Sequence, residues 1–157
     1  MKSKNLLASL AVVAALLPAA ANADTAVNKA LAIEALSATL GASNPDAVDQ
    51  YFGPQYIQHN PDVPNGTEAL KGLITTLSQS GNFNADFVRV IADDDMVAFH
   101  GRYEGFGPTP MIAFDVFRLE DGKIVEHWDN LIDEAAPNPS GHTQIDGATE
   151  ITDLAKT

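Results

Sequence analysis

The sequence has no cysteine, and this absence excludes several kinds of structure and chemistry. No disulfide can form, and no thiol is present to act as a nucleophile. Lipoprotein processing, which needs a cysteine after an apolar leader, is excluded as well. The fold must therefore be held together by its hydrophobic core, and a chain of 157 residues is long enough to form one.

Basic residues are scarce. The chain has 9 Lys and Arg against 21 Asp and Glu, which gives a formal net charge of −12 at pH 7. A surface this negative repels nucleic acid and anionic lipid. We therefore expect no nucleic-acid partner and, once the leader described next has been removed, no membrane partner.

Long apolar runs are also missing, apart from one near the start of the chain. Leu6 to Leu17 is uncharged, but it is shorter than the ~20 residues needed to cross a bilayer. The run follows two lysines and precedes Ala21-Asn22-Ala23, which offers the small residues that a signal peptidase requires. This pattern predicts a signal peptide over 1–23 and a mature chain, 24–157, that is periplasmic or secreted.

The mature chain changes from helical to strand-like periodicity near its middle. Helices are predicted where apolar residues recur at helical spacing, over 25–40, 45–52 and 67–80. Strands are predicted over 55–60, 87–91, 96–103, 111–119 and 123–131. This order indicates an α+β domain in which the helices cover one face of a curved antiparallel sheet. The tail, 133–157, is rich in Pro, Asn, Gly and Thr, and we expect it to be loosely ordered or to wrap the surface.

Polar residues inside these apolar strands are the candidates for a functional site, because burying them costs free energy unless they are hydrogen-bonded. The candidates are His59, His100, Asp115, His127 and Asp129. Asp115 lies within Ala113 to Phe117, and its charge is explained if one face of the sheet lines a pocket. Other interpretations stay open. The two aspartates could form ion pairs with Arg102 or Arg118 at a solvated rim. His100 could be a partly buried strand histidine that is hydrogen-bonded to a neighbour, and His59 could cap the turn at Asn60-Pro61.

The loop between the last two strands decides which of these side chains share a face. If the loop is Glu120-Asp121-Gly122, Asp115 pairs with His127, and Asp129 projects from the same face as both. A two-residue loop would instead pair Asp115 with Trp128 and turn the other two side chains away. The residues alone leave both alternatives open. A face with two carboxylates and an imidazole has the groups that general acid/base chemistry needs.

Segments covering nearly the whole mature chain resemble SnoaL-like proteins, which are relatives of the polyketide cyclases that close a ring by intramolecular aldol condensation. The similar segments, in the order seen in that family, are Tyr56 to Pro61, Asn65-Gly66, Ala113 to Arg118 and Asp121 to Asp129. The run from Gly122 to Asp129 is the most specific of them. The family belongs to the nuclear transport factor 2-like superfamily.

The resemblance implies a cone-shaped curved sheet that encloses an apolar pocket with the helices, and a homodimer formed through the outer sheet face. In the cyclases an aspartate late in the last strand is the acid/base, a position that Asp129 matches. Asp115 occupies the place of the cyclases' assisting histidine, which is a departure from the family pattern. In related ketosteroid isomerases a similarly placed aspartate stays neutral and donates a hydrogen bond to an enolate. The three-residue loop agrees with this family geometry, and we adopt it as the prediction.

The sequence therefore predicts an acid/base enzyme without cofactor, acting on a carbon acid next to a carbonyl in a small apolar ligand. Asp129 would act as the general base or acid, and Asp115 and His127 would stabilise the enolate. The predicted substrate-binding residues are His59, His100, Tyr56 and Trp128. No metal is expected, because among the histidines and Asp129 only His127 and Asp129 are closely spaced. The alternative is a binding module of the same fold that performs no reaction.

Overall fold

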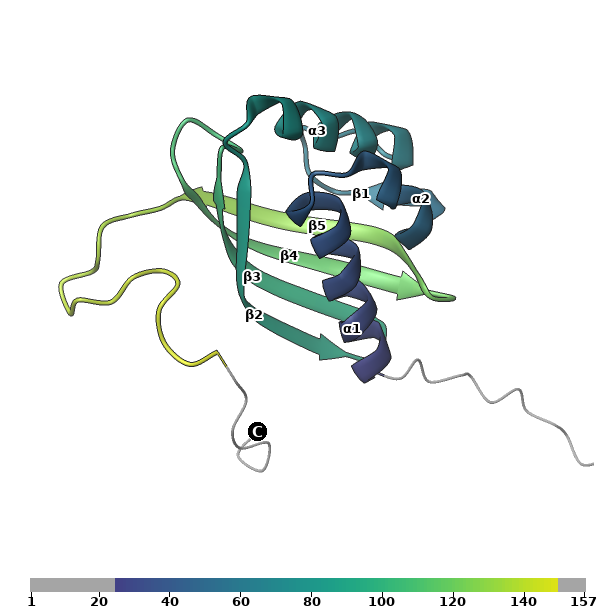
Figure 1. Ribbon diagram of the computed structural model, residues 1–157. Coiled ribbons are helices and arrows are strands. Elements are labelled where there is room, and N and C mark those ends of the chain that lie inside the picture. Colours follow the sequence, from purple (N-terminus) through teal and green to yellow (C-terminus); the bar gives the residue numbers. More distant parts are fainter. Residues whose placement is uncertain (1–24, 150–157) are drawn as a thin grey trace, which may run out of the picture.

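Helices make up the first part of the computed structural model, which describes residues 25–149 (Figure 1). The three α-helices are α1 (Thr25–Leu36), α2 (Val48–Tyr51) and α3 (Thr67–Ser80). A π-helical turn, Ser37–Gly41, continues α1, and a 3-10 turn, Pro45–Ala47, precedes α2. The predicted signal peptide lies outside the described residues. Within them, no helix is long and apolar enough to cross a membrane.

Local sequence signals explain where these helices begin and end. The side chain of Asn44 accepts a hydrogen bond from the backbone N–H of Asp46, and Pro45 takes the first position of the turn. α3 ends at Gly81, whose φ of 70° is the left-handed conformation that glycine adopts most easily. α2 is shorter than predicted, because Phe52 is already extended (φ −103°, ψ 145°) and begins the first strand.

Five strands form one curved sheet in the order β1-β5-β4-β3-β2. The strands are β1 (Phe52–Gln58), β2 (Asn84–Asp93), β3 (Met96–Glu104), β4 (Met111–Glu120) and β5 (Lys123–Asp133). The four later strands are antiparallel neighbours, as predicted. The prediction of a wholly antiparallel sheet is wrong for β1, which pairs with β5 in parallel. A parallel pair needs a long crossover, and the chain between β1 and β5 supplies one.

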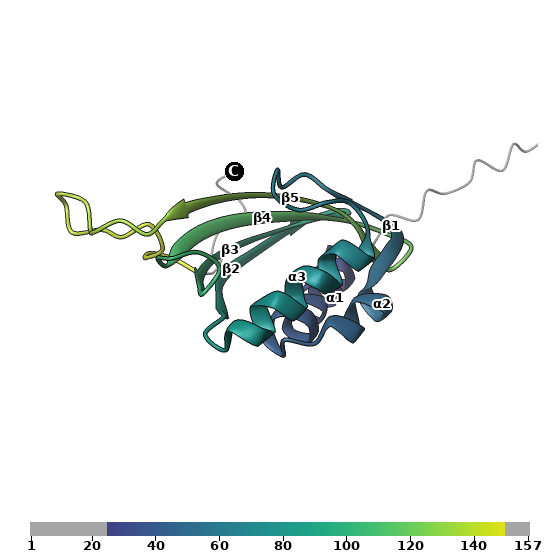
Figure 2. The same ribbon diagram turned by 90° about the horizontal axis from the view of Figure 1, so that it is seen from above.

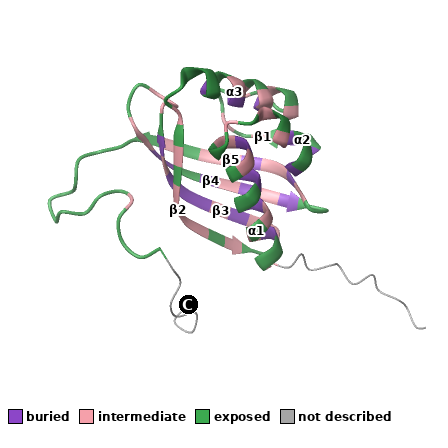
Figure 3. Ribbon diagram, in the orientation of Figure 1, coloured by how far each residue is buried: buried purple, intermediate pink, exposed green. Residues whose placement is uncertain are grey.

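The helices all lie on the concave face of the sheet, which arches over them (Figure 2). Buried apolar side chains from all three helices and from β1, β3, β4 and β5 form one core between the two layers. Figure 3 marks the buried residues in purple. Ala32 and Leu36 of α1, Ile74 of α3, and Phe99 and Phe117 of the sheet are all at most 4% exposed. The α+β architecture predicted from the sequence is confirmed, with the sheet open rather than closed.

The described part of the tail, residues 134–149, has no regular structure and is largely exposed (Figure 3). It returns to the sheet at one point on β2. There the guanidinium of Arg89 donates hydrogen bonds to the backbone carbonyls of Ile145, Asp146 and Ala148. The described tail is therefore attached to the sheet through residues 145–148, whereas most of the segment before them extends away from the domain (Figure 1).

Candidate active site

The hairpin between β4 and β5 sets the face on which the site residues lie. Its loop is Asp121-Gly122, and both residues have positive φ (50° and 72°), as in a type I′ turn. The predicted three-residue loop is therefore wrong. A β-bulge compensates for it: Leu119 pairs with Ile124 and Arg118 with Glu126, which leaves one extra residue, Val125, on β5.

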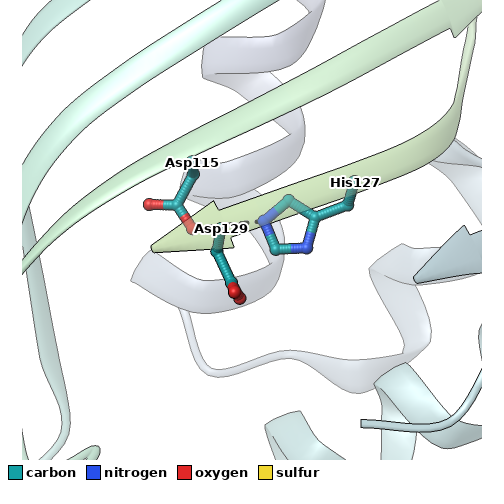
Figure 4. A group of neighbouring side chains, drawn as sticks. All are labelled: Asp115, His127 and Asp129. Carbon is teal, nitrogen blue, oxygen red and sulfur yellow. Dashed lines mark hydrogen bonds and ion pairs between the residues drawn. The ribbon is translucent and has the colours of Figure 1, made fainter. Parts of the chain in front are cut away.

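The bulge shifts the register by one residue and brings the predicted side chains to one face after all. Asp115 lies directly opposite Asp129, and His127 lies opposite Phe117, two residues along β4. All three polar side chains then project to the concave side (Figure 4). One ligating atom from each lies within 4.8 Å of the others. The predicted convergence of these residues is confirmed, by a register that neither sequence alternative contained.

These side chains form the polar end of a cavity between the sheet and the helices. The cavity and the open solvent at its mouth together have an empty volume of about 580 Å³. Most of its wall is apolar, with Leu36 from α1, Leu73 from α3 and Phe83 just before β2 among the lining residues. A mostly apolar cavity with a few convergent polar groups is typical of a small-molecule site.

Asp115 and His127 form a buried pair whose hydrogen bonds require a shared proton. His127 Nδ1 lies 2.9 Å from Gln58 Oε1, which also accepts the backbone N–H of Asn60, so the amide orientation is fixed. His127 must then donate from Nδ1. Its Nε2 lies 3.2 Å from Asp115 Oδ1. An unprotonated nitrogen facing an unprotonated carboxylate would be repulsive, so one proton lies between them.

Asp129 has different surroundings, although it faces Asp115 across the sheet. Both of its carboxylate oxygens accept from the side-chain amide of Asn60, at 2.9 and 2.8 Å. It is also less buried than Asp115, which is 5% exposed. Asp129 is therefore the carboxylate that is more open to a ligand, and a neutral amide holds it in place.

Two tyrosine hydroxyls complete the polar end. Burial first, and then the charges of Asp129 and Asp115, raise the pKa of Tyr56. Burial, the charge of Asp115 and the hydrogen bond to it likewise raise the pKa of Tyr103, whose hydroxyl donates to Asp115 Oδ2 at 2.9 Å. Tyr56 accepts from Gln58 Nε2 at 3.3 Å. No group among the described residues accepts a hydrogen bond from the Tyr56 hydroxyl, so this hydroxyl can donate one to a ligand.

Three of the predicted substrate-binding residues lie outside this cavity. His59 stacks on Trp128 at 4.8 Å between ring centroids, and its Nε2 lies 2.9 Å from Glu126 Oε1. His100 stacks on Phe114 at 4.1 Å, away from the cavity lining. Alternation along the strands explains the positions of Trp128 and His100, because Trp128 is next to Asp129 and His100 is next to Phe99, and neighbouring residues of a strand point to opposite faces. Tyr56 alone of the four lines the cavity.

Gln58, Asn60 and Tyr103 take part in the site and were missed by the sequence reasoning. Gln58 and Asn60 recur with Tyr56 at every second position, which is a signal for one side of an extended segment. Tyr103 follows Phe99 on β3 at an even spacing. The ion pairs considered for the two aspartates are not formed in the described chain: Arg118 contacts Glu120 and Glu126 instead.

The same cluster has donor atoms that could hold a metal ion. Asp115, His127 and Asp129 offer oxygen and nitrogen ligands on one face. Both ring nitrogens of His127 already have partners, Gln58 and Asp115. A metal at His127 would have to replace one of these contacts.

A family model of the SnoaL-like domain matches residues 33–127. The chain belongs to the SnoaL-like family. No curated protein sequence matches this SnoaL-like chain. Its family membership and its nuclear transport factor 2-like fold are as the resemblance implied.

Solved structures with the same fold include proteins of several kinds. TsrD from Streptomyces laurentii is 20% identical, with a TM-score of 0.57, and the match covers 69% of this chain and 90% of that one. An LEH-like epoxide hydrolase from M. tuberculosis is 22% identical, with a TM-score of 0.55 and coverage of 69% and 84%. A proposed ketosteroid isomerase from Kribbella flavida is 13% identical, with a TM-score of 0.62 and coverage of 82% and 97%. At these identities the likeness shows the fold alone, so the activity must be argued from the site.

Proposed function

We propose that this SnoaL-like protein is an acid/base enzyme that needs no cofactor and removes a proton from a carbon next to a carbonyl. One observation supports this most directly: two carboxylates face each other in an apolar cavity with different partners. Among the described residues, Asp129 accepts hydrogen bonds only from the neutral amide of Asn60, whereas Asp115 shares a proton with His127. Paired carboxylates in unlike surroundings are the arrangement in which one acts as base and the other as acid.

The residues divide the reaction between them. Asp129 takes the proton as the C–H bond breaks, the electron pair of that bond forms the new C–C double bond, and the π electrons of the carbonyl group move onto its oxygen. The hydroxyl proton of Tyr56, which no described residue accepts, is available to that oxygen, and the neutral Asp115–His127 pair adds no negative charge to the site. Donors placed where negative charge develops stabilise the transition state most. Gln58 and Tyr103 hold the pair in position.

The resulting enolate can add to a second carbonyl or be reprotonated elsewhere, so both aldol-type ring closure and isomerisation are open to this site. Of the similar structures named above, one is described as an LEH-like epoxide hydrolase and one as a proposed ketosteroid isomerase, which supports an enzyme of this fold. Export of the mature chain and a homodimer remain proposals from the sequence and the family resemblance.

Substitution of Asp129 tests the proposal. Asp129→Asn keeps the shape of the side chain and removes its proton affinity. We expect α-carbon proton–deuterium exchange of an accepted substrate, found by screening β-keto esters and cyclic ketones by NMR, to slow by about two to four orders of magnitude. Asp133→Asn is the matched control. Asp133 is on the same strand, but it is exposed, accepts a hydrogen bond from the Thr109 hydroxyl and lies outside the cavity.

The control should exchange at the wild-type rate. If the wild-type protein binds these compounds but exchanges their protons no faster than Asp129→Asn does, the enzyme proposal fails. The chain is then the non-catalytic binding module that the sequence left as the alternative.

A further inference from the structure

The cavity contains acidic groups without a compensating cation. Its described lining residues include Asp115, Asp129 and His127, but no lysine or arginine. We propose that the cavity selects uncharged carbonyl compounds and rejects ligands that bring a carboxylate or a phosphate into it. That such compounds are substrates rests on the proposed function, whereas their selection is a property of binding and can be measured without turnover.

The hydrogen bonds fix the charge of the site before a ligand binds. With one shared proton, Asp115 and His127 together are neutral, whether the proton is on nitrogen or on oxygen. Asp129 accepts two contacts from an amide and adds one negative charge. An anionic ligand would be a second negative charge in an apolar space, where like charges repel strongly and burial of an unpaired charge is costly.

Five of the six lysines and arginines in the described chain are already engaged, and the sixth, Lys29 on α1, does not line the cavity. Arg102 contacts Glu104 and Glu134, and Arg118 contacts Glu120 and Glu126. Further positive side chains are also committed: Lys71 to Asp49 and Glu68, Arg89 to the tail, and Lys123 to the backbone carbonyl of Gln50. None of these five is free to turn into the cavity and neutralise an anion.

An uncharged substrate fits the chemistry proposed for the site. When Asp129 takes a proton from such a substrate, the carboxylate becomes neutral and the enolate becomes negative. The total charge of the cavity therefore stays the same during the step. A substrate with its own carboxylate would hold an additional negative charge beside the enolate throughout, and the lining residues offer no partner for it.

A matched pair of ligands tests the selection. Methyl 4-acetylbenzoate and 4-acetylbenzoate share one aryl ketone and differ in charge at neutral pH. Binding is measured by ligand-observed NMR and calorimetry, and the larger pair methyl 6-acetyl-2-naphthoate and its free acid is measured alongside. We expect the wild-type protein to bind each ester at least about tenfold more tightly than its carboxylate, because juxtaposed like charges are costly.

Leu131 allows the charge of the lining to be changed. This residue lies on β5 two positions after Asp129, lines the cavity and is partly exposed, so a long polar side chain can extend toward solvent. Leu131→Lys should bind the carboxylates more tightly and abolish or reverse the preference for the esters. Leu131→Gln, of similar length but uncharged, should retain the wild-type preference.

Each outcome decides the proposal. Equal wild-type affinity for ester and carboxylate overturns it, as does equal behaviour of the lysine and glutamine variants. Failure of both esters to bind overturns it too, because the cavity then does not accept apolar carbonyl compounds. If the esters bind selectively but show no α-proton exchange, the charge selection stands and the proposed enzyme function fails.

Discussion

Among single residues, the hydroxyl of Tyr103 is the one whose removal most directly tests the buried network. It donates to Asp115 Oδ2, and both residues are 5% exposed. Tyr103→Phe leaves that oxygen buried without its donor, and this should lower the free energy of unfolding by about 1–3 kcal/mol. Urea unfolding followed by circular dichroism measures the change.

Tyr56→Phe is the matched control for this substitution. Tyr56 is equally buried, at 2% exposed, but its hydroxyl only accepts from Gln58 at 3.3 Å. Its loss should therefore cost less stability than the loss of the Tyr103 hydroxyl, while it should slow any reaction in which that proton reaches the substrate. Equal destabilisation by the two changes would show that the Tyr103–Asp115 bond contributes no special stability.

Among the elements, the β4–β5 hairpin shows what the sequence could and could not predict. Their place inside apolar strands led to the prediction that Asp115, His127 and Asp129 face one cavity, and the structure places them there. It could not reveal the bulge, because Val125 is a strand-forming residue with no local mark of an irregular position. On the other side of β5, in β1, Gly53 leaves room for the Val125 side chain.

The fit between Gly53 and Val125 can be tested by filling the space. A Cβ atom at position 53 would lie 2.9 Å from Val125 Cγ1, and the branched valine side chain has little freedom to turn away. Gly53→Ala should therefore destabilise the protein by about 1–3 kcal/mol through overpacking. Thermal and urea unfolding measure this loss.

Val125→Ala in the same chain supplies the complementary change. It removes the clashing methyl groups, so the double variant should recover part of the stability lost in Gly53→Ala, with a coupling of about 0.5–3 kcal/mol as expected for residues in contact. Purely additive effects of the two substitutions would mean that the glycine is not needed to accommodate the bulge.

At the scale of the whole molecule, the order and type of the elements followed from the sequence, whereas contacts between distant segments did not. Helical spacing, the Asn44 cap and Gly81 predicted the helices closely. The parallel pairing of β1 with β5 joins segments more than sixty residues apart. The attachment of the tail to Arg89 is equally remote in sequence. No local pattern encodes such contacts, because they depend on how the finished layers pack.

The stability of the whole fold should fall as the pH is lowered through the range in which an unfolded histidine titrates, about 6.5. Burial first, and the charge of Arg89 second, lower the pKa of His100 in the folded chain. Arg89 Nη1 donates to its Nδ1 at 3.1 Å, and within residues 25–149 its buried Nε2 has no hydrogen-bond partner. Both features favour the neutral ring.

The sign follows from proton binding. Below pH 6.5 the unfolded chain takes up a proton at His100 before the folded chain does, so the free energy of unfolding decreases. This contribution is complete above that pH and is lost as the pH falls through the lowered folded pKa. The pKa of Glu126 is also lowered, by hydrogen bonds from His59 and Arg118, but its effect on stability belongs to the more acidic range below about 4.5.

Urea unfolding measured between pH 8 and about 5 tests the role of His100. The free energy of unfolding should change less steeply with pH in His100→Gln than in the wild-type protein, and the glutamine amide oxygen can still accept a hydrogen bond from Arg89. An unchanged slope in that variant would assign the acid sensitivity to other groups.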